Sequence, residues 1–121
     1  MINEKTEREI AIMEAYLEGK RIQVSIRGGQ WLNTPVPAWD WSFCDYRIVD
    51  GVRREIFSGR LKCEAKTRDY IEVMSAHLQG KTIQKRKCGW RDTDEWIDLY
   101  SPKWDWGVNE YRIKPEEGDE Q

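Results

Sequence analysis

Residues 39–48 read Trp-Asp-Trp-Ser-Phe-Cys-Asp-Tyr-Arg-Ile, and residues 104–113 read Trp-Asp-Trp-Gly-Val-Asn-Glu-Tyr-Arg-Ile. The same Trp-Asp-Trp and Tyr-Arg-Ile therefore occur twice in the chain, with the same spacing between them. A pattern that recurs in this way is typical of a supersecondary unit that is used more than once. These two stretches decide the fold prediction, because they mark the ends of two equivalent units.

The identity between the two halves continues upstream of each stretch. With a shift of 61 positions Thr6 aligns with Thr67, and after a four-residue insertion in the second copy the shift becomes 65. The upstream residues of the first copy that recur in the second are Thr6, Ile10, Met13, Ala15, Leu17, Gly19, Lys20, Ile22, Gln23 and Gly28 at the first shift, and Trp31 and Pro37 at the second. We therefore predict that segments 6–48 and 67–113 share one fold.

Each unit is predicted to begin with a helix. Apolar residues recur at helical spacing in residues 10–17, and Thr6 with Glu9 forms the pattern of a capping box. Gly19 and Gly80 follow where the two helices would end, because glycine tolerates the left-handed conformation beyond a helix C-terminus.

Three short strands are predicted after each helix. Apolar and polar residues alternate in residues 22–27, which indicates a half-buried strand. The fold class is therefore α+β, a tandem duplication of an α-β-β-β unit in which each small antiparallel sheet packs on one helix. Because a half of this size would be marginally stable alone, we expect the halves to pack on each other or the chain to form a homo-oligomer.

The predicted organisation has four parts. Residues 1–50 form the first repeat, 51–65 a linker with a hairpin strand, 66–115 the second repeat, and 116–121 a disordered acidic tail. Asp50-Gly51 is a hairpin turn signal, so residues 46–49 are expected to turn back into residues 52–57. The tail contains no apolar residue that could hold it to a core.

Composition limits the classes of partner. The chain of 121 residues has 35% charged residues and a net charge of −2, which gives no general attraction to nucleic acid or to anionic membranes. No stretch is long and apolar enough for a membrane span, and no signal peptide begins the chain, so a cytoplasmic protein is expected.

The cysteines, Cys44, Cys63 and Cys88, form no Cys-x-x-Cys pair, so neither a disulfide framework nor a zinc site is expected.

Catalytic motifs are absent from the sequence. It has no glycine-rich phosphate loop, nucleophile elbow or cluster of metal ligands. Its single histidine, His77, aligns with Tyr16, so the duplicated unit does not depend on an imidazole. Asp40 and Asp105 could act as bases, but no neighbouring residue completes a mechanism. We therefore predict a protein that is not an enzyme and that uses no cofactor and no metal.

Tryptophans and basic residues, most of them shared by the two copies, are the candidates for binding. Stacked indoles form a platform for a planar ligand, and arginine presents a fork to phosphate or carboxylate oxygens. The alternative is that the indoles form the core and the cations are solvated. The candidate ligand-binding residues are Trp39, Trp41, Arg47, Trp90, Trp104, Trp106, Arg112, Lys20 and Lys81.

The end of each unit resembles small bacteriophage and prophage proteins, which carry a helix ending in Gly-Lys, a middle Trp and a closing Tyr-Arg-Ile-Lys-Pro, here residues 111–115. A more distant resemblance is to the second family of Thoeris anti-defence proteins. The matching residues are Leu78, Gly80, Lys81, Ile83, Gly89, Trp90, Glu110, Tyr111 and Ile113 in the second copy, and Leu17, Gly19, Lys20, Ile22, Asp45, Tyr46 and Ile48 in the first.

The resemblance implies a phage-encoded, non-catalytic sponge that sequesters a nucleotide-derived immune signal in the host cytoplasm. This chain differs from that family in its duplication, in Gly28-Gly29 where the family has Gly-Trp, and in the additional Trp-Asp-Trp. Two alternatives stay open. One is a protein-binding inhibitor of a host defence enzyme that uses exposed Trp and Tyr as anchors. The other is a weak nucleic-acid-binding module that uses residues 85–87.

Overall fold

The computed structural model describes residues 4–52, 60–87 and 95–115. Within these ranges the order helix, strand, strand, strand occurs twice, as the repeat predicts. The elements are α1 (Glu4–Leu17), β1 (Lys20–Ile26), β2 (Trp31–Asn33), β3 (Cys44–Val52), α2 (Arg60–Leu78), β4 (Ile83–Lys87), β5 (Ile97–Leu99) and β6 (Asn109–Ile113).

Each unit folds its strands into a three-stranded antiparallel sheet with the first strand in the centre, in the orders β2-β1-β3 and β5-β4-β6. The register is also the same, because Ile22 pairs with Ile48 in one sheet and Ile83 with Ile113 in the other. Ile22 and Ile83 therefore occupy equivalent strands. The predicted α+β duplication is confirmed.

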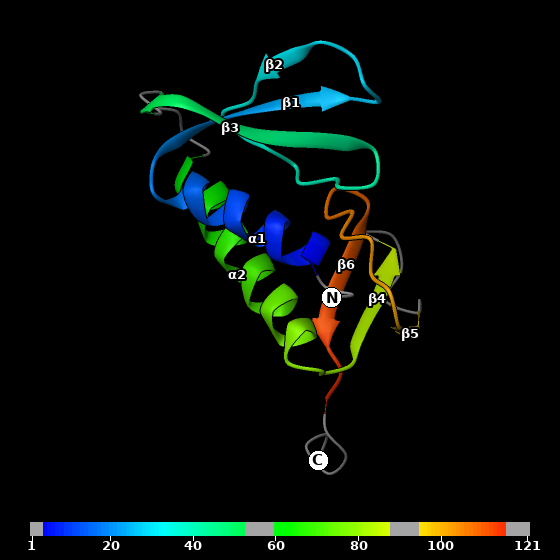
Figure 1. Cartoon of the computed structure of the whole chain (residues 1–121). Coiled ribbons are helices and arrows are strands. Elements are labelled where there is room, and N and C mark those ends of the chain that lie inside the picture. Colours follow the sequence, from blue (N-terminus) through cyan, green and yellow to red (C-terminus); the bar gives the residue numbers. More distant parts are fainter. Residues whose placement is uncertain (1–3, 53–59, 88–94, 116–121) are drawn as a thin grey trace.

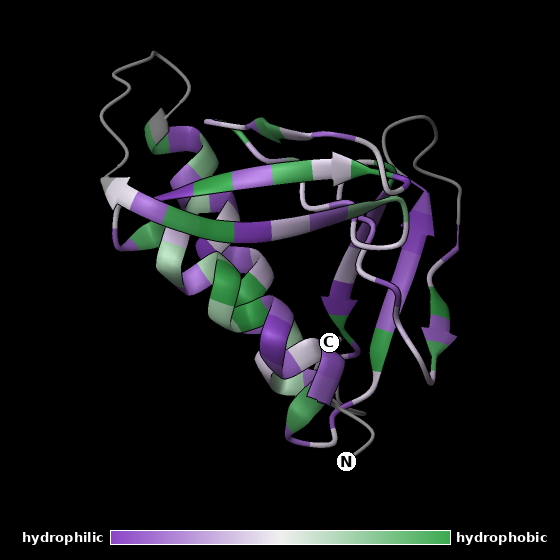
Figure 2. Cartoon of the chain, turned by 45° about the horizontal axis from the view of Figure 1, so that its top comes forward, coloured by the Kyte–Doolittle hydropathy of each residue, from purple (hydrophilic) through white to green (hydrophobic). Residues whose placement is uncertain are grey.

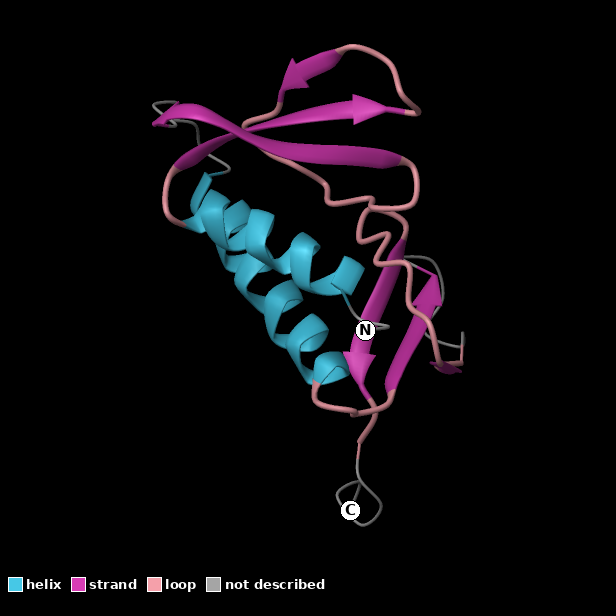
Figure 3. Ribbon diagram, in the orientation of Figure 1, coloured by secondary structure: helices cyan, strands magenta, loops and turns pink. Residues whose placement is uncertain are grey.

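The two helices lie side by side and run in opposite directions, with one sheet above them and the other beside them in the view of Figure 1. Helix α1 packs against β1 and β3, and α2 packs against β6. The ribbon in Figure 3 shows that the long connections before β3 and before β6 meet between the two sheets. Apolar and polar residues alternate along β1 and β3 (Figure 2), as expected for strands with one face on the core.

Glycines end both helices as predicted. Gly19 has a φ of 95° and Gly80 a φ of 89°. After α2, the N–H of Lys81 donates to the carbonyl of Ala76 and the N–H of Gly80 to that of His77, both at 3.0 Å. These bonds satisfy carbonyls that the last turn leaves without helical partners.

The predicted hairpin at Asp50-Gly51 is wrong. Strand β3 continues through both residues to Val52. Gly51 has a φ of 108°. It lies where the pairing of β3 with β1 is irregular, because the register of the two strands shifts between Lys20 and Arg21. The rest of the predicted hairpin, residues 53–57, and the acidic tail, residues 116–121, lie outside the described residues.

The predicted capping box is also wrong. Helix α1 already includes Glu4, so Thr6 lies within the helix, where it is buried. Its equivalent Thr67 lies well inside α2, which begins at Arg60 and so includes part of the segment that the sequence assigned to the linker. Both threonines instead accept a hydrogen bond from the other unit.

The two Trp-Asp-Trp motifs meet where the units join. Asp40 and Asp105 pair as an isolated antiparallel β-bridge. The N–H of Trp41 donates to the carbonyl of Trp104, and the N–H of Trp106 donates to the carbonyl of Trp39, both at 3.3 Å. We call residues 39–41 and 104–106 the seam.

Side chains repeat this exchange across the seam. The indole N–H of Trp39 donates to Thr67 Oγ1 at 3.0 Å, and the indole N–H of Trp104 donates to Thr6 Oγ1 at 3.2 Å. Each indole belongs to one unit and each threonine to the helix of the other. Reciprocal contacts of this kind are the signature of a two-fold relation.

The seam carboxylates are bonded in the same reciprocal way. Asp105 accepts from the backbone N–H of Ser42 at 2.8 Å and from its hydroxyl at 2.6 Å. Asp40 accepts from the N–H of Gly107, the position equivalent to Ser42, at 2.6 Å. The backbone of each unit is thereby fixed by an acid of the other.

We expect Thr67→Val to lower the free energy of unfolding by about 1–3 kcal/mol, because the buried indole N–H of Trp39 loses its acceptor while side-chain shape is kept. Thr6→Val should have a similar effect through Trp104. Urea unfolding with Thr82→Val, an exposed position, as the control measures the difference. Equal stability of all three variants and the wild type would show that the exchange contributes nothing.

Candidate functional site

The structure stacks the predicted tryptophans in pairs. The ring centroids of Trp39 and Trp41 are 5.6 Å apart with an interplanar angle of 15°, and those of Trp104 and Trp106 are 5.7 Å apart at 11°. All four side chains are buried, at 9% exposure or less. The motif is not an extended strand, because Trp39 and Trp104 have φ values of 59° and 62°. The pairs therefore belong to the core, and only their margins reach the surface.

Arg47 and Arg112 lie on the other face of their sheets. Arg47 follows the buried Tyr46 along β3, and successive side chains of a strand point to opposite faces. Its guanidinium lies 4.3 Å from the ring centroid of Trp31, and that of Arg112 lies 4.3 Å from that of Trp96. The structure therefore does not bring these arginines to the seam indoles.

The remaining predicted residues lie apart from both groups. Lys20 is exposed at the start of β1, with its Nζ 3.9 Å from Glu18 Oε1. Lys81 is exposed just after α2. Trp90 lies outside the described residues.

A groove of about 810 Å³ opens between α2 and β6. The first unit contributes residues 36–39 to its wall, and α2 contributes Lys62, Lys66 and Tyr70. The segment from Trp106 to Tyr111 closes the other side, together with Trp96. Both units therefore build the groove, and the seam sets its position.

Aromatic rings form the floor of the groove. Tyr70 stacks on Trp106 with ring centroids 4.0 Å apart and an interplanar angle of 12°. Trp106 in turn contacts Tyr111 at 4.7 Å in an edge-on arrangement. Trp106 was predicted as a binding residue, whereas Tyr70 was not. The only feature of the sequence that singles out Tyr70 is its departure from the repeat, since Glu9 occupies the equivalent position.

Charged groups of both signs surround the groove. Lys62 and Lys66 are exposed and lie one turn apart on α2. Asp69 and Glu110 also line the groove, and Glu110 accepts a hydrogen bond from Arg86 Nε at 3.0 Å. The two lysines can meet an anionic group, and the carboxylate of Asp69 can accept from a ligand N–H.

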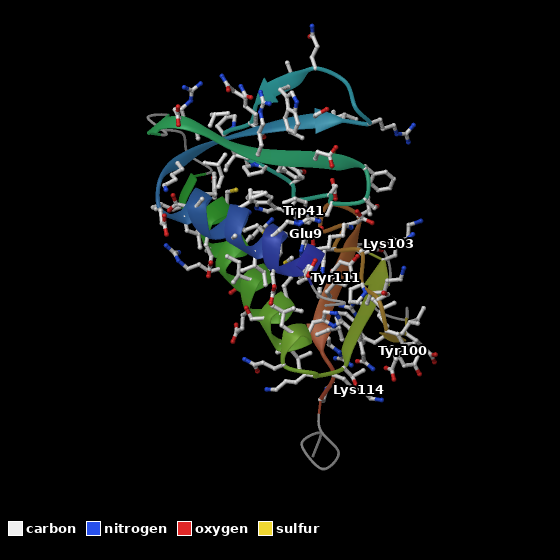
Figure 4. All side chains as sticks on the ribbon, in the orientation of Figure 1. Glu9, Trp41, Tyr100, Lys103, Tyr111 and Lys114 are labelled. Atoms are coloured by element: carbon white, nitrogen blue, oxygen red, sulfur yellow. The ribbon has the colours of Figure 1, made fainter. Side chains whose placement is uncertain are left out.

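Glu9 occupies in α1 the position that Tyr70 occupies in α2. Its side chain is buried, and neither carboxylate oxygen has a hydrogen-bond partner in the described part of the chain. Lys5 Nζ stands 3.5 Å from Oε2, an ion-pair distance that is too long for a strong hydrogen bond. Figure 4 shows Glu9 and Trp41 inside the molecule where the units join, whereas Tyr100 and Lys114 lie at the periphery.

Burial raises the pKa of Glu9 from 4.5 to about 7. Lys5 and Arg8 act in the opposite direction, and the charge of Asp105 adds slightly to the increase. The neutral carboxyl is therefore the form that the folded protein favours at mildly acidic pH.

The free energy of unfolding should fall as the pH rises from about 4.5 through 7, because the folded state binds the Glu9 proton more tightly than the unfolded state does. The loss amounts to at most about 3 kcal/mol. Glu9→Gln removes this dependence and should be more stable than the wild type at pH 8. Urea unfolding at pH 4.5 and pH 8 tests this, with the exposed Glu7→Gln as the control. A Glu9→Gln variant that loses stability equally at both pH values would contradict it.

Burial lowers the pKa of His77, whose ring packs edge-on against Trp104 at 5.8 Å. No group of three His, Cys, Asp or Glu residues that could hold a metal ion occurs in the described part of the chain. Cys44 and Cys63 are free thiols, while Cys88 is outside the described ranges. None of the helices there has the length and apolar character needed to cross a membrane.

Comparisons of the chain with protein-family models, with curated proteins and with solved structures gave no match.

Proposed function

We propose that this chain is a non-catalytic binding protein whose groove between α2 and β6 holds a planar, anionic, nucleotide-like ligand. The observation that carries the proposal is a groove built by both units in which a stacked Tyr70–Trp106 pair lies beside Lys62 and Lys66. Its volume of about 810 Å³ suits a small-molecule site, since such sites typically span about 300–1,000 Å³.

The groove offers each part of such a ligand a matching group. Tyr70 is half-buried, whereas Trp106 is 6% exposed, so a nucleobase would lie against Tyr70 with Trp106 behind it. Ammonium groups of Lys62 and Lys66 would meet the phosphates, and Asp69 would accept from an exocyclic amine. Binding of this kind requires no base or nucleophile.

Within this proposal the protein is phage-encoded and sequesters a nucleotide-derived immune signal in the cytoplasm of the host cell. The support is the match between the chemistry of the groove and the ligand class that the resemblance implies. Sequestration requires only that the bound ligand is withheld from its receptor.

A second candidate is an inhibitor that binds a host protein. It is favoured by the apolar surface around β5, where Tyr100 is 96% and Ile97 58% exposed. Exposed aromatic side chains commonly anchor protein interfaces.

Calorimetric titration with adenine and guanine nucleotides, cyclic dinucleotides and ADP-ribose tests the proposal. At least one of these should bind, and Lys66→Ala should weaken it about tenfold or more, because a charge-assisted contact is lost. Lys81→Ala, which removes an exposed lysine away from the groove, is the matched control and should bind normally. No binding at millimolar concentration, or equal losses in both variants, would contradict the proposal. Thermal melts verify that each variant is folded.

A further inference from the structure

The outer face of the first sheet carries a connected network of four side chains. Arg47 donates from Nε at 3.0 Å and from Nη2 at 2.7 Å to Gln23 Oε1. Gln23 Nε2 donates to Asn33 Oδ1 at 3.2 Å. The Arg47 guanidinium lies over the ring of Trp31. The network thus crosses all three strands and holds the guanidinium against an indole.

The second sheet carries the same network at the equivalent positions. Arg112 Nε donates to Gln84 Oε1 at 2.8 Å, and Gln84 Nε2 donates to Asp98 Oδ1 at 2.7 Å. The Arg112 guanidinium lies over the ring of Trp96. We call these two sets the outer-face clusters. They are separate from the seam and from the groove lysines, and Trp96 of the second cluster also lines the groove, whereas Trp31 of the first does not.

Packing does not require this agreement between the two sheets. Other positions on the same outer faces differ between the two units, so the sheet accepts more than one side chain there. The differing pairs, with equivalent positions given together, are Arg21 and Thr82, Ser25 and Arg86, and Val49 and Lys114. In contrast, the Trp, Arg and Gln of the cluster are identical in both units, and Asn33 is replaced only by the similar Asp98. Since a single surface cation–π contact is worth only about 0.5–1 kcal/mol, stability alone is a weak reason for keeping the whole cluster twice.

The arrangement leaves a defined edge of each arginine available. A guanidinium has five N–H groups. The glutamine engages Nε and Nη2 of Arg47 and Nε of Arg112. The end formed by Nη1 and Nη2 keeps N–H groups that can bind a carboxylate with two parallel hydrogen bonds. The indole beneath holds the guanidinium plane, so less side-chain freedom is lost on binding.

The structure contains an internal example of such a contact. The guanidinium of Arg86 lies 4.5 Å from the ring centroid of Trp96 and donates from Nε to the carboxylate of Glu110 at 3.0 Å. A guanidinium supported by this indole therefore already binds a side-chain carboxylate.

We propose that each outer-face cluster is a docking site for a carboxylate side chain of a partner protein, so that one chain presents two equivalent sites. Trp and Arg are the residues that most often dominate protein interfaces. A nucleic acid suits these faces less well, because Asp45 and Glu110 lie two residues before Arg47 and Arg112 on their strands and a row of closely spaced phosphates would meet this negative charge on both sheets. A single carboxylate on each fork avoids most of that repulsion.

Nuclear magnetic resonance of the full-length chain tests the proposal. The probes are an acetylated, amidated octapeptide of alternating Glu and Ala, its Gln-Ala counterpart and an eight-residue thymidine oligonucleotide. The Glu peptide should shift the indole N–H signals of both Trp31 and Trp96, and the Gln peptide should not. Arg47→Lys should weaken the response at Trp31 about tenfold and leave Trp96 unchanged, because lysine keeps the charge without the fork. Arg112→Lys should do the converse.

Arg27→Lys, at an exposed position outside both clusters, is the matched control and should respond like the wild type. Equal responses to the Glu and Gln peptides, an unchanged response in the arginine variants, or larger shifts at Trp31 with the oligonucleotide would each overturn the proposal. The unperturbed signals of the seam indoles verify the fold. Nucleotide binding in the groove is measured separately by calorimetry, and Trp31, which does not line the groove, reports on a docking site alone, so the two proposals can fail independently.

Discussion

The exchange of indole N–H groups between the two units is the interaction on which the rest of the structure depends. Trp39 and Trp104 are almost fully buried, and a buried donor without an acceptor is costly. Each finds its acceptor only on the helix of the opposite unit, at Thr67 or Thr6. Neither unit can therefore complete its core without the other. The same exchange sets the loop at residues 36–39 beside α2, and so it creates the groove.

The fold could be predicted because the duplication makes each local signal appear twice. The alternation of side chains along a strand could also have placed Arg47 on the sheet face opposite to that of the buried Tyr46. The threonines were misassigned as caps because capping is a local preference, whereas their actual partner lies in the other unit. Composition could not decide whether the tryptophans form the core or a ligand-binding platform, since both roles favour indole side chains. The stacking of Tyr70 on Trp106 depends on how helix and loop meet in space, which the sequence pattern does not specify.

Differences between the copies are as informative as the identities. Gly107 stands where the other unit has Ser42, and a Cβ added there would lie 2.5 Å from Asp40 Oδ2, so the Asp40 carboxylate would have to shift to admit a side chain. Tyr70 borders a groove on one side, whereas Glu9 is a buried acid on the other. The seam has therefore kept its symmetry while the surfaces beside it have diverged, which is the pattern expected when one of two equivalent sites becomes specialised.

Hydrogen exchange of the indole N–H groups of Trp39 and Trp104 under native conditions tests the central claim most directly. If the two units form one body through the seam, both indoles should exchange only by global unfolding, with the same free energy of opening as the slowest backbone amides of β1 and β4. If one indole exchanges much faster than the other, or both exchange well before the sheets open, the units are independent and the seam does not hold them together.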